Sequence, residues 1–548
     1  MLKSEAHQLN FLSVLYNRIP EKHILKRINS AISLSFINDL LKDSYCSNFG
    51  RPAKEPEMMM RILILQNLYN LSDERVIEDL SVNLAYMWFI GINPDDALPD
   101  SSLLSKFRTT RLKDISLDEI ITEIVRQCVE NGIISDITGV SMDATHIEAN
   151  TIREMPERIM KRLVKKIFKA SGQEDIEIPD YTKIENHKEA KQVMKEYLEE
   201  VIEKNESNPA VEAEIQEAKK ILESPLFIEQ KGIRSLIDKD ARVGYKSKTE
   251  PFFGYKAEYC QTIDGELITA VKVENGAYVD GTNFEELLGI CKKTGISIDS
   301  FYGDKAYFKM KIIEQLEKEN INVYIPTSAS AYKVDEELYT YNKDSDQWFC
   351  INGNETIRVK LGSSERNKNL RYYFKKELCK NCPYHEQCIG NSKLVRKILH
   401  VGLNAPKYYE YNQFNKTEKF KEEYKKRARI EGKNSEMKRF HGLARAKWYG
   451  LVAVSKQTKL TVIAVNLKKI AKLFSSKKGQ KILKMYKKVF ATSMRSSMST
   501  PAPFCKMGRD SISSPSSLQI LYSLSDNVKY SNCFVRRSLS RPPPLYCV

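Results

Sequence analysis

The sequence predicts an α/β core that carries inserted segments and is preceded by an all-α N-terminal domain. The first observation is that apolar residues recur at helical spacing, between helix caps, from Ile24 to about Cys128. The second is that short apolar runs alternate with helical stretches from Ile133 onward. Such alternation is typical of a sheet that is covered by helices.

The composition favours an acidic polymer as the partner. The chain has 548 residues, of which 42% are hydrophobic and 29% charged, and its net charge is +16. We find no apolar run of about 18 residues and no signal-peptide pattern after Met1, so we expect a cytoplasmic protein that binds no membrane. The eleven cysteines are an odd number scattered over a long chain, which favours reduced thiols over a disulfide framework.

The N-terminal domain is predicted to cover residues 1–132. An apolar stretch with helical periodicity runs from Pro56 to Leu65. Ser72 then stands directly before a second helical stretch, where its hydroxyl would cap the helix. Repeated stretches of this kind indicate a compact helical domain.

The α/β core is predicted to cover residues 133–478. Its first strand is short and buried, and we expect it to end at Asp143. A later strand reaches Asp304, and a carboxylate at a strand end of an open α/β sheet is in a position typical of ligand sites. The elements expected after the first strand are strands at 254–260 and 267–273 joined by a turn at 264–265, a helix at 281–294, a strand at 296–302 and a helix at 307–319.

Two segments are predicted to be insertions in this core. The first, about 151–240, is rich in glutamate and lysine and helical by propensity. The second, about 322–407, is strand-rich and contains a cluster of cysteines. An apolar helix at 460–470 would close the core, and residues 491–548 are predicted to form a disordered tail rich in serine and proline.

Four side chains near the end of the core share one helical face. At about 100° per residue, Tyr424, Arg427, Glu431 and Lys438 fall on a stripe roughly 60° wide. One interpretation is a solvated stripe with ion pairs between successive turns. The other is a functional face, on which the two cations contact phosphate oxygens and the tyrosine hydrogen-bonds or stacks near a bound strand.

Three carboxylates would make a site for divalent metal ions. Asp143 and Asp304 are the candidates at strand ends, although aspartate is also frequent there as a helix N-cap. Glu431 is the third, because Glu422 and Glu436 face away from the stripe on the same helical wheel. Hard divalent cations take oxygen ligands, and phosphoryl transfer on nucleic acid commonly uses two such ions.

A glycine interrupts the helix that carries this stripe. Gly432 costs about 1 kcal/mol relative to alanine in a helix interior. The cost suggests close approach of another group, and a local break in the helix is the alternative.

The spacing Tyr424-x2-Arg427-x3-Glu431-x6-Lys438 resembles the YREK signature of DDE transposases encoded by bacterial insertion sequences. Similar blocks surround the two aspartates, and an expected strand at 253–256 resembles another part of the same core. The N-terminal domain is similar to the helical DNA-binding domain of these enzymes. These further resemblances are found in seven short segments: Ser141–Thr145, Gly303–Tyr307, Phe253–Lys256, Gly50–Pro52, Met87–Gly91, Pro99–Ser101 and Phe107–Arg108.

The resemblance implies a ribonuclease-H-like core and a Mg²⁺-dependent enzyme, with Mn²⁺ as a substitute, that acts on transposon ends. Asp143, Asp304 and Glu431 would hold the ions, and Tyr424, Arg427 and Lys438 would contact DNA. Cleavage at the terminal inverted repeats would be followed by attack of the freed 3′-hydroxyl on target DNA. It further implies a nucleoid-associated protein that acts as a homodimer on two ends. Asn434 stands where relatives often have an aromatic residue.

A cysteine cluster in the second insertion has partial metal-ligand spacing. Cys379-x2-Cys382-x5-Cys388 would supply three zinc ligands, and Cys350 or His400 would complete a four-ligand site. The alternative is a set of reduced loop thiols, and both interpretations stay open at this point.

Two other functions are also open. One is a DNA-binding protein that has lost catalysis, such as a repressor or a decayed element copy, and the atypical tail keeps this alternative open. The other is a Mg²⁺-dependent nuclease of another kind, if cleavage shows no preference for inverted repeats.

Overall fold

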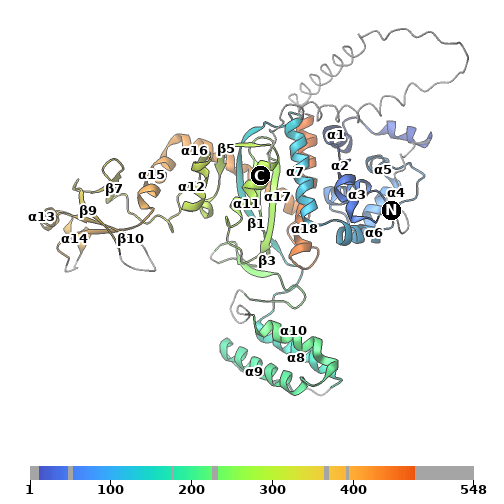
Figure 1. The fold of residues 1–548 in the computed structure, drawn as a ribbon, viewed down its shortest axis with the longest axis horizontal. Coiled ribbons are helices and arrows are strands. Elements are labelled where there is room, and N and C mark those ends of the chain that lie inside the picture. The colour runs from blue at the N-terminus through green and yellow to red at the C-terminus, as the bar shows by residue number, and fades with distance from the viewer. Residues whose placement is uncertain are drawn as a thin grey trace, which may run out of the picture. The chain divides into compact units, whose positions relative to one another are not determined.

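A computed structural model describes residues 11–46, 53–173, 177–224, 227, 232–247, 249–362, 369–390 and 394–475. These include the carboxylates and the cysteine cluster singled out above. The predicted tail at 491–548 lies outside the described residues. Figure 1 shows the order of the helices and strands.

The N-terminal region is helical, as predicted. Ser72 caps helix α4 by accepting a hydrogen bond from the backbone N–H of Arg75 at 3.1 Å. Pro56 opens α3 at a position where its missing N–H costs nothing. The helical elements are η1 (Phe11–Arg18), α1 (Ile24–Ala31), α2 (Phe36–Leu41), η2 (Lys42–Ser44), α3 (Pro56–Tyr69), α4 (Asp73–Val82), α5 (Leu84–Ile90), α6 (Ser102–Lys106), the π-turn η3 (Phe107–Arg111) and α7 (Asp114–Glu130).

The core is a mixed six-stranded sheet. Its strands are ordered β2-β3-β1-β5-β6, and β4 also pairs with β3. The pairs of β3 with β1, β2 and β4 are antiparallel, whereas β1–β5 and β5–β6 are parallel. The strands are β1 (Ile137–Glu148), β2 (Arg242–Tyr245), β3 (Pro251–Thr262), β4 (Ile268–Asn275), β5 (Ser297–Tyr302) and β6 (Asn322–Tyr324).

The hairpin between β3 and β4 turns close to the predicted position. Gly265 and Glu266 both have positive φ angles, of 77° and 51°. Two successive residues with positive φ match the twist of antiparallel strands, and glycine adopts this conformation without strain. The turn therefore lies one residue later than the Asp264-Gly265 pair that the sequence suggested.

Helices cover both faces of the sheet. Helices α11 (Phe284–Lys293) and α12 (Met310–Lys318) share a buried cluster with Val140, Met142 and Phe301 of the central strands. On the other face, α18 (Leu451–Phe474) packs with residues of β3 and β4. The predicted apolar helix at 460–470 is thus confirmed as part of the core.

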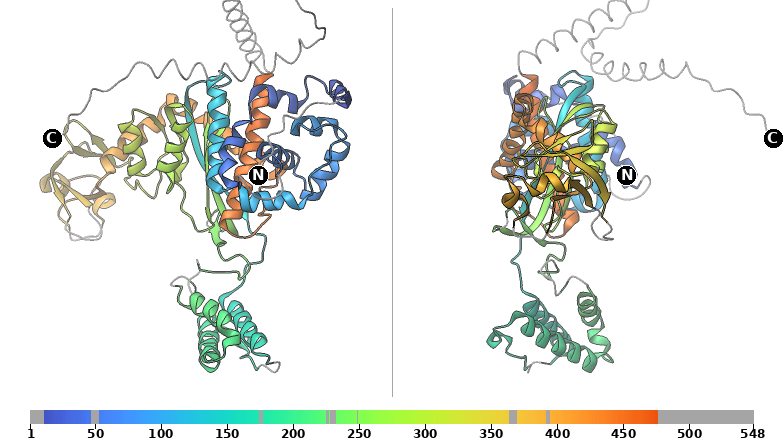
Figure 2. Two further views of the ribbon diagram at one scale, coloured as in Figure 1. Left: turned by 45° about the vertical axis from the view of Figure 1, so that its right-hand side comes forward. Right: turned by 90° about the vertical axis from the view of Figure 1, so that its left-hand side faces the viewer.

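Helix α18 also belongs to the core of the N-terminal helices. It lies beside α7 (Figures 1 and 2), and residues of α1, α3, α7 and α18 form one buried cluster with β3 and β4. The Lys459 ammonium reinforces this packing with ion pairs to Asp114 and Asp118, each 2.7 Å long. The predicted boundary at residue 132 therefore separates two parts that share one hydrophobic core, and their independence as domains stays a prediction.

The first predicted insertion contains helices with a small core of their own. Apolar side chains of α8, α9 and α10, among them Ile159, Met194 and Ile215, form a separate buried cluster. The elements are α8 (Pro156–Ser171), η4 (Tyr181–Lys183), α9 (His187–Asn205), η5 (Pro209–Val211) and α10 (Glu212–Leu222).

The second predicted insertion, about 322–407, is strand-rich, as expected, but its first residues form β6 of the core sheet, so the insertion begins after Tyr324. Strands β7 and β8 form one hairpin, and β9, β10 and β11 form a three-stranded antiparallel sheet. Trp348 and Tyr372 are fully buried at its centre. The elements are β7 (Tyr339–Asn342), β8 (Gln347–Cys350), β9 (Thr356–Leu361), β10 (Asn369–Phe374), α13 (Lys376–Lys380), α14 (His385–Ile389) and β11 (Ile398–Gly402).

A run of helices connects this segment to α18. It consists of α15 (Ala405–Lys416), α16 (Glu418–Tyr424), the 3₁₀ turn η7 (Lys425–Arg427) and α17 (Ala428–Phe440). Among the helices that the structure describes, none combines the length and the apolar character needed to cross a bilayer.

Candidate active site

Asp143 and Asp304 lie at the same edge of the sheet because β1 and β5 run parallel. The last pair in the register of β1 with β5 is Ser141 with Tyr302. Asp143 comes two residues after Ser141, and Asp304 comes two residues after Tyr302. The sequence suggested that the first strand ends at Asp143, but in the structure it does not. Strand β1 continues to Glu148, because β3 pairs with it along its whole second half. What ends at Ser141 is only the parallel pairing with β5.

The Asp304 carboxylate also has a structural role. It caps the 3₁₀ turn η6 (Lys305–Tyr307) by accepting a hydrogen bond from the backbone N–H of Ala306 at 2.9 Å. The N-cap interpretation of this aspartate is therefore correct, and it is compatible with a second role. The cap fixes the carboxylate at the end of β5, beside Asp143.

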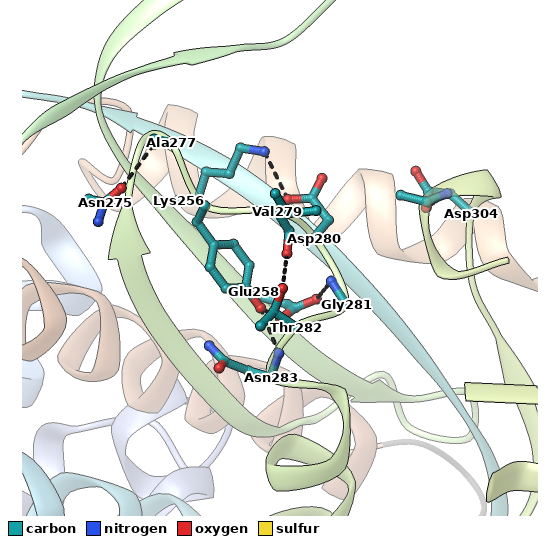
Figure 3. A network of polar contacts seen from close by, with 12 residues as sticks. Lys256, Glu258, Asn275, Ala277, Val279, Asp280, Gly281, Thr282, Asn283 and Asp304 are labelled. Atoms are coloured by element: carbon teal, nitrogen blue, oxygen red, sulfur yellow. Dashed lines mark hydrogen bonds and ion pairs between the residues drawn. The ribbon is translucent and has the colours of Figure 1, made fainter. Parts of the chain in front are cut away.

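A buried carboxylate holds the segment that follows Asp304. Glu258 of β3 is fully buried and accepts hydrogen bonds from the hydroxyls of Tyr278 and Tyr307. It also accepts from the backbone N–H of Gly281, the contact that Figure 3 shows. Tyr307 is the last residue of η6, so this network ties the turn after Asp304 to the centre of the sheet. Burial, and next the charge of Glu258, raises the pKa of Tyr307, so its hydroxyl stays a donor.

A neighbouring ion pair closes the same loop. The Lys256 ammonium contacts the Asp280 carboxylate at 2.8 Å, and Lys309 donates to the carbonyl of Asp280 at 2.6 Å (Figure 3). The loop between β4 and α11 is thus attached both to β3 and to the segment after η6. This arrangement makes the position of Asp304 depend on residues that lie far from it in sequence.

Helix α17 brings the third predicted carboxylate to this edge. The Arg427 guanidinium contacts Asp143 at 3.3 Å and Glu431 at 3.1 Å, so it bridges the two carboxylates. The helix is not continuous from Tyr424 to Lys438, because η7 interrupts it at 425–427 with a tighter turn. Arg427 nevertheless faces the same side as Glu431.

Asn434 is a member of this site that the sequence interpretation missed. Its side chain donates to Asp143 at 2.9 Å and accepts from the hydroxyl of Tyr259 at 2.8 Å. Tyr259 is the residue of β3 that lies opposite Asp143 in the register. At about 100° per residue Asn434 falls roughly 20° from Arg427, just beside the stripe, so a slightly wider search of the wheel for amides would have found it.

The electrostatics of Asp143 indicate a place for a cation. Burial raises the pKa of Asp143 to about 6; the guanidinium of Arg427 opposes this shift, and the negative charge of Asp304 adds to it. Burial and the like charge of Asp304 destabilise the ionised form of Asp143. A cation bound between these two carboxylates would stabilise that form.

The residues fit a divalent metal in chemistry, and Glu431 is the loosest of them. Two aspartates with hard oxygen donors lie at the sheet edge, whereas the Glu431 side chain is 67% exposed and is paired with Arg427. Within the described ranges, no three His, Cys, Asp or Glu side chains already form a ready metal cluster. Glu431 would therefore have to move from Arg427 toward the aspartates when an ion binds.

Two family models match the chain. A transposase domain (DUF772) matches residues 13–110, and a transposase DDE domain matches residues 349–471. The chain belongs to the DDE transposases. It is accordingly an enzyme that cleaves DNA and transfers strands in DNA transposition, and DDE transposases depend on divalent metal ions. The DDE match contains Arg427, Glu431 and Lys438, while Asp143 and Asp304 lie outside both matched ranges.

Other comparisons add little. Among solved structures, the transposase is similar to a piggyBac transposase synaptic complex with hairpin DNA, at 10% identity and a TM-score of 0.27, over 98% of this chain and 87% of that one. A likeness at this level supports no argument. No curated protein matches the chain.

Lys438 of the transposase lies beside the carboxylates. Its ammonium contacts the Nδ1 of His146, on β1, at 3.1 Å. Burial, and next the charge of Lys246, lowers the pKa of Lys438 to about 8. Burial and the charges of Lys438, Lys246 and Lys256 lower the pKa of His146 to about 4, so this imidazole is neutral and accepts.

This shift predicts a pH-dependent contact with DNA. If Lys438 contacts phosphate, DNA affinity should fall by about 1.5 kcal/mol, roughly tenfold, as pH rises from 7 to 9 through the lowered pKa. Fluorescence anisotropy with end DNA in EDTA would measure it. The variant Lys438→Arg keeps its charge over this range and should lose much less. Equal losses in both proteins would refute the contact.

Tyr424 lies within the field of all three carboxylates. Its ring stacks on Phe420 with centroids 5.4 Å apart. Burial raises the pKa of Tyr424; Arg427 opposes the shift, and Asp304, Asp143 and Glu431 add to it. The transposase thus gathers Tyr424, Arg427, Glu431 and Lys438 with both aspartates at one edge of the sheet.

Gly432 is not approached by any described part of the chain. A Cβ added to it would meet no atom within 4 Å, so a close contact inside the protein does not explain this glycine. Gly432→Ala should raise the free energy of unfolding by about 0.5–1 kcal/mol, measured by denaturant titration. Gly289→Ala in α11 is a matched control with equally open surroundings, and it should gain as much. A loss of stability confined to Gly432→Ala would contradict this prediction.

The cysteine cluster of the transposase lies apart from the carboxylates. Cys379 belongs to α13, Cys388 to α14, and Cys382 to the link between them, and all three line one small cavity. Cys350 of β8 lines the same cavity, whereas His400 lies exposed on β11 and is not among its lining residues.

Proposed function

We propose that this enzyme is a YREK-type transposase of a bacterial insertion sequence, in which Asp143, Asp304 and Glu431 hold Mg²⁺ and the substrate is the terminal inverted repeats. The observation that carries the proposal is that Arg427 bridges Asp143 and Glu431 at the sheet edge where Asp304 also follows its strand. Mn²⁺ would substitute for Mg²⁺, because both ions take oxygen ligands.

The sheet supports a ribonuclease-H-like core. Strands β1, β3 and β4 are antiparallel, and β5 and β6 then add to β1 in parallel, which gives the order β4-β3-β1-β5-β6. The two aspartates lie on the central β1 and directly after its parallel neighbour β5. Helix α17 supplies the third carboxylate from outside the sheet.

The metal would supply a Lewis acid that activates the attacking water or 3′-hydroxyl and neutralises charge on the phosphate. Asn434 and Tyr259 orient the Asp143 carboxylate through two hydrogen bonds. Glu258 and the cap at Ala306 hold Asp304 in place. Arg427, once released from Glu431, would face the scissile phosphate with a planar guanidinium suited to phosphate oxygens.

The remaining assignments follow the same proposal. Lys438 would contact a phosphate near the cut, and Tyr424 would limit the space beside it. The helical N-terminal region would bind the transposon end, and a homodimer would hold two ends together. The enzyme would act in the cytoplasm, at the nucleoid.

The test combines metal binding with cleavage. At pH 7.5, Mg²⁺ or Mn²⁺ should raise the melting temperature of the wild type and not that of Asp143→Asn or Asp304→Asn. Both variants should bind end DNA normally and fail to cut it. A wild type that binds the ends but stays inert with either ion would indicate a catalytically inactive DNA-binding relative. Cleavage without preference for inverted repeats would instead favour another nuclease.

The metal-free protein offers a separate check on Asp143. The pKa of Asp143 is raised from 3.8 to about 6 in the folded protein, so protonation of this carboxyl favours folding. The resulting stability is fully present below pH 3.8 and is lost as pH rises through 6. Asp143→Asn in EDTA should therefore be more stable than the wild type at pH 7.5, by about 1–2 kcal/mol. A destabilised variant would contradict this electrostatic account.

A further inference from the structure

Four cysteines from three separate elements converge in the strand-rich segment. Cys350 ends β8, Cys379 lies in α13, Cys388 lies in α14, and Cys382 lies between these two short helices. Cys350 and Cys379 are 29 positions apart in the sequence, so the fold and not local spacing brings them together. All four are partly buried and are free thiols.

The four thiols line one cavity of about 20 Å³. A space of that size holds roughly one water-sized species. The surrounding residues include Tyr339, Phe374 and Lys397, which enclose the cavity with apolar surface and one cation.

The segment around the cavity is poor in other stabilising features. Helices α13 and α14 have five residues each, which is too short for a stable helix in isolation. The apolar cluster beneath them is small and includes Trp348, Tyr372 and Phe374. Small folds of this kind usually need a disulfide or a metal in addition to their core.

Side chains beside the cavity suit a cluster of thiolates. The Tyr339 hydroxyl donates toward the sulfur of Cys388 at 3.9 Å. The Lys397 ammonium donates to the carbonyl of Cys388 at 2.6 Å, so a positive charge lies at the edge of the site. A tetrahedral zinc ion with four thiolates has a net double negative charge, which such a donor and such a cation stabilise.

The structure also separates the candidates for the fourth ligand. His400 is exposed on β11 and is absent from the cavity lining, so it does not complete the site. His385 also lines the cavity, and its Nδ1 lies 2.8 Å from the carbonyl of Cys379, which makes its Nε2 the alternative to one of the four sulfurs. Cys350, at the end of β8, lines the cavity and supplies the fourth sulfur.

We propose that the thiolates of Cys350, Cys379, Cys382 and Cys388 bind one structural Zn²⁺. In the described ranges no three such side chains are already set around one point, so binding would draw the sulfurs inward and release their protons. The ion would join β8 to α13 and α14. This site does not depend on the proposed role of the carboxylates, since none of its residues contacts them.

Zinc content of the full-length protein is the first test. After dialysis against a chelating resin, elemental analysis should find about one zinc per wild-type chain. Cys350→Ser and Cys379→Ser should lose it, with the affinity for Zn²⁺ reduced by more than about 100-fold. His400→Ala and Cys46→Ser are matched controls and should keep the ion, as should Asp143→Asn.

Cobalt substitution distinguishes the ligand set. Co²⁺ in a four-sulfur site gives intense thiolate-to-metal absorption, which Cys350→Ser should weaken and His385→Ala should leave nearly unchanged. Loss of zinc in His400→Ala together with retention in Cys350→Ser would overturn the assignment. A wild type without zinc, or one with a disulfide between Cys379 and Cys382, would overturn the site itself.

A measurement on the wild type avoids variants that fail to fold. Stripping with a chelator should increase hydrogen exchange in peptides from 339–362 and 369–390, and added Zn²⁺, unlike Mg²⁺, should reverse the change. Peptides of β1 and β5 should be unaffected. Unchanged exchange in the cysteine segment after complete stripping would refute a structural role for the ion.

Discussion

Glu431→Gln is expected to reduce cleavage and strand transfer by at least about 10²- to 10³-fold, while end binding and stability stay close to wild type. The loss follows from removing a charge that would hold metal beside Asp143. Stability should change little, because the side chain is 67% exposed and its ion pair with Arg427 is worth less than about 1 kcal/mol at the surface. Cleavage of labelled end DNA and denaturant unfolding would measure the two effects.

Glu436→Gln is the matched control and should show the opposite pattern. Glu436 contacts the buried Lys433 at 3.2 Å and Lys468 at 2.9 Å, on the face of α17 that points away from Asp143. Its loss leaves a buried ammonium with a weaker partner, which should cost about 1–3 kcal/mol of stability. Cleavage at a temperature where the protein stays folded should be near normal. Equal loss of cleavage in both variants would refute the assignment of helix faces.

Glu258→Gln is expected to lower the free energy of unfolding by about 2–4 kcal/mol. The fully buried carboxylate accepts from Tyr278, Tyr307 and Gly281, and an amide would turn an N–H₂ group toward donors. Because Tyr307 ends the turn capped by Asp304, cleavage should also fall in the fraction that is folded. Urea titration and single-turnover cleavage would separate the two losses.

An exposed glutamate provides the control for this change. Glu286 pairs with Lys272 at the surface, and Glu286→Gln should alter stability by no more than about 0.5 kcal/mol. Tyr307→Phe removes one of the three hydrogen bonds and should give an intermediate loss. A Glu258→Gln protein as stable as the wild type would show that the network is not needed to hold the loop after β4.

The sequence predicted the elements whose signals are local. Ser72 caps its helix through its own hydroxyl, and the residues around Gly265 make the hairpin by their own φ angles. The β-α-β unit that ends at Asp304 was likewise predicted from the alternation of strand-type and helix-type spacing of apolar residues. These features depend on neighbouring residues, so they can be read without knowing the fold.

The errors arose where a distant segment decides the local structure. Strand β1 extends past Asp143 because β3 pairs with it as far as Glu148, more than 100 positions away. The tighter turn at 425–427 contains no glycine or proline that would have indicated it in the sequence. Asn434 becomes a partner of Asp143 only because Tyr259 lies opposite that aspartate. The sequence left Cys350 and His400 as equal candidates until the fold put only one of them at the cavity.

The shared core around α18 has a consequence for how the chain is made. The apolar residues of α1 share one buried cluster with α18, which lies more than 400 positions later in the sequence. Prematurely terminated chains would expose this apolar surface and tend to aggregate. We therefore expect the N-terminal helices to be fully stable only in chains that include α18.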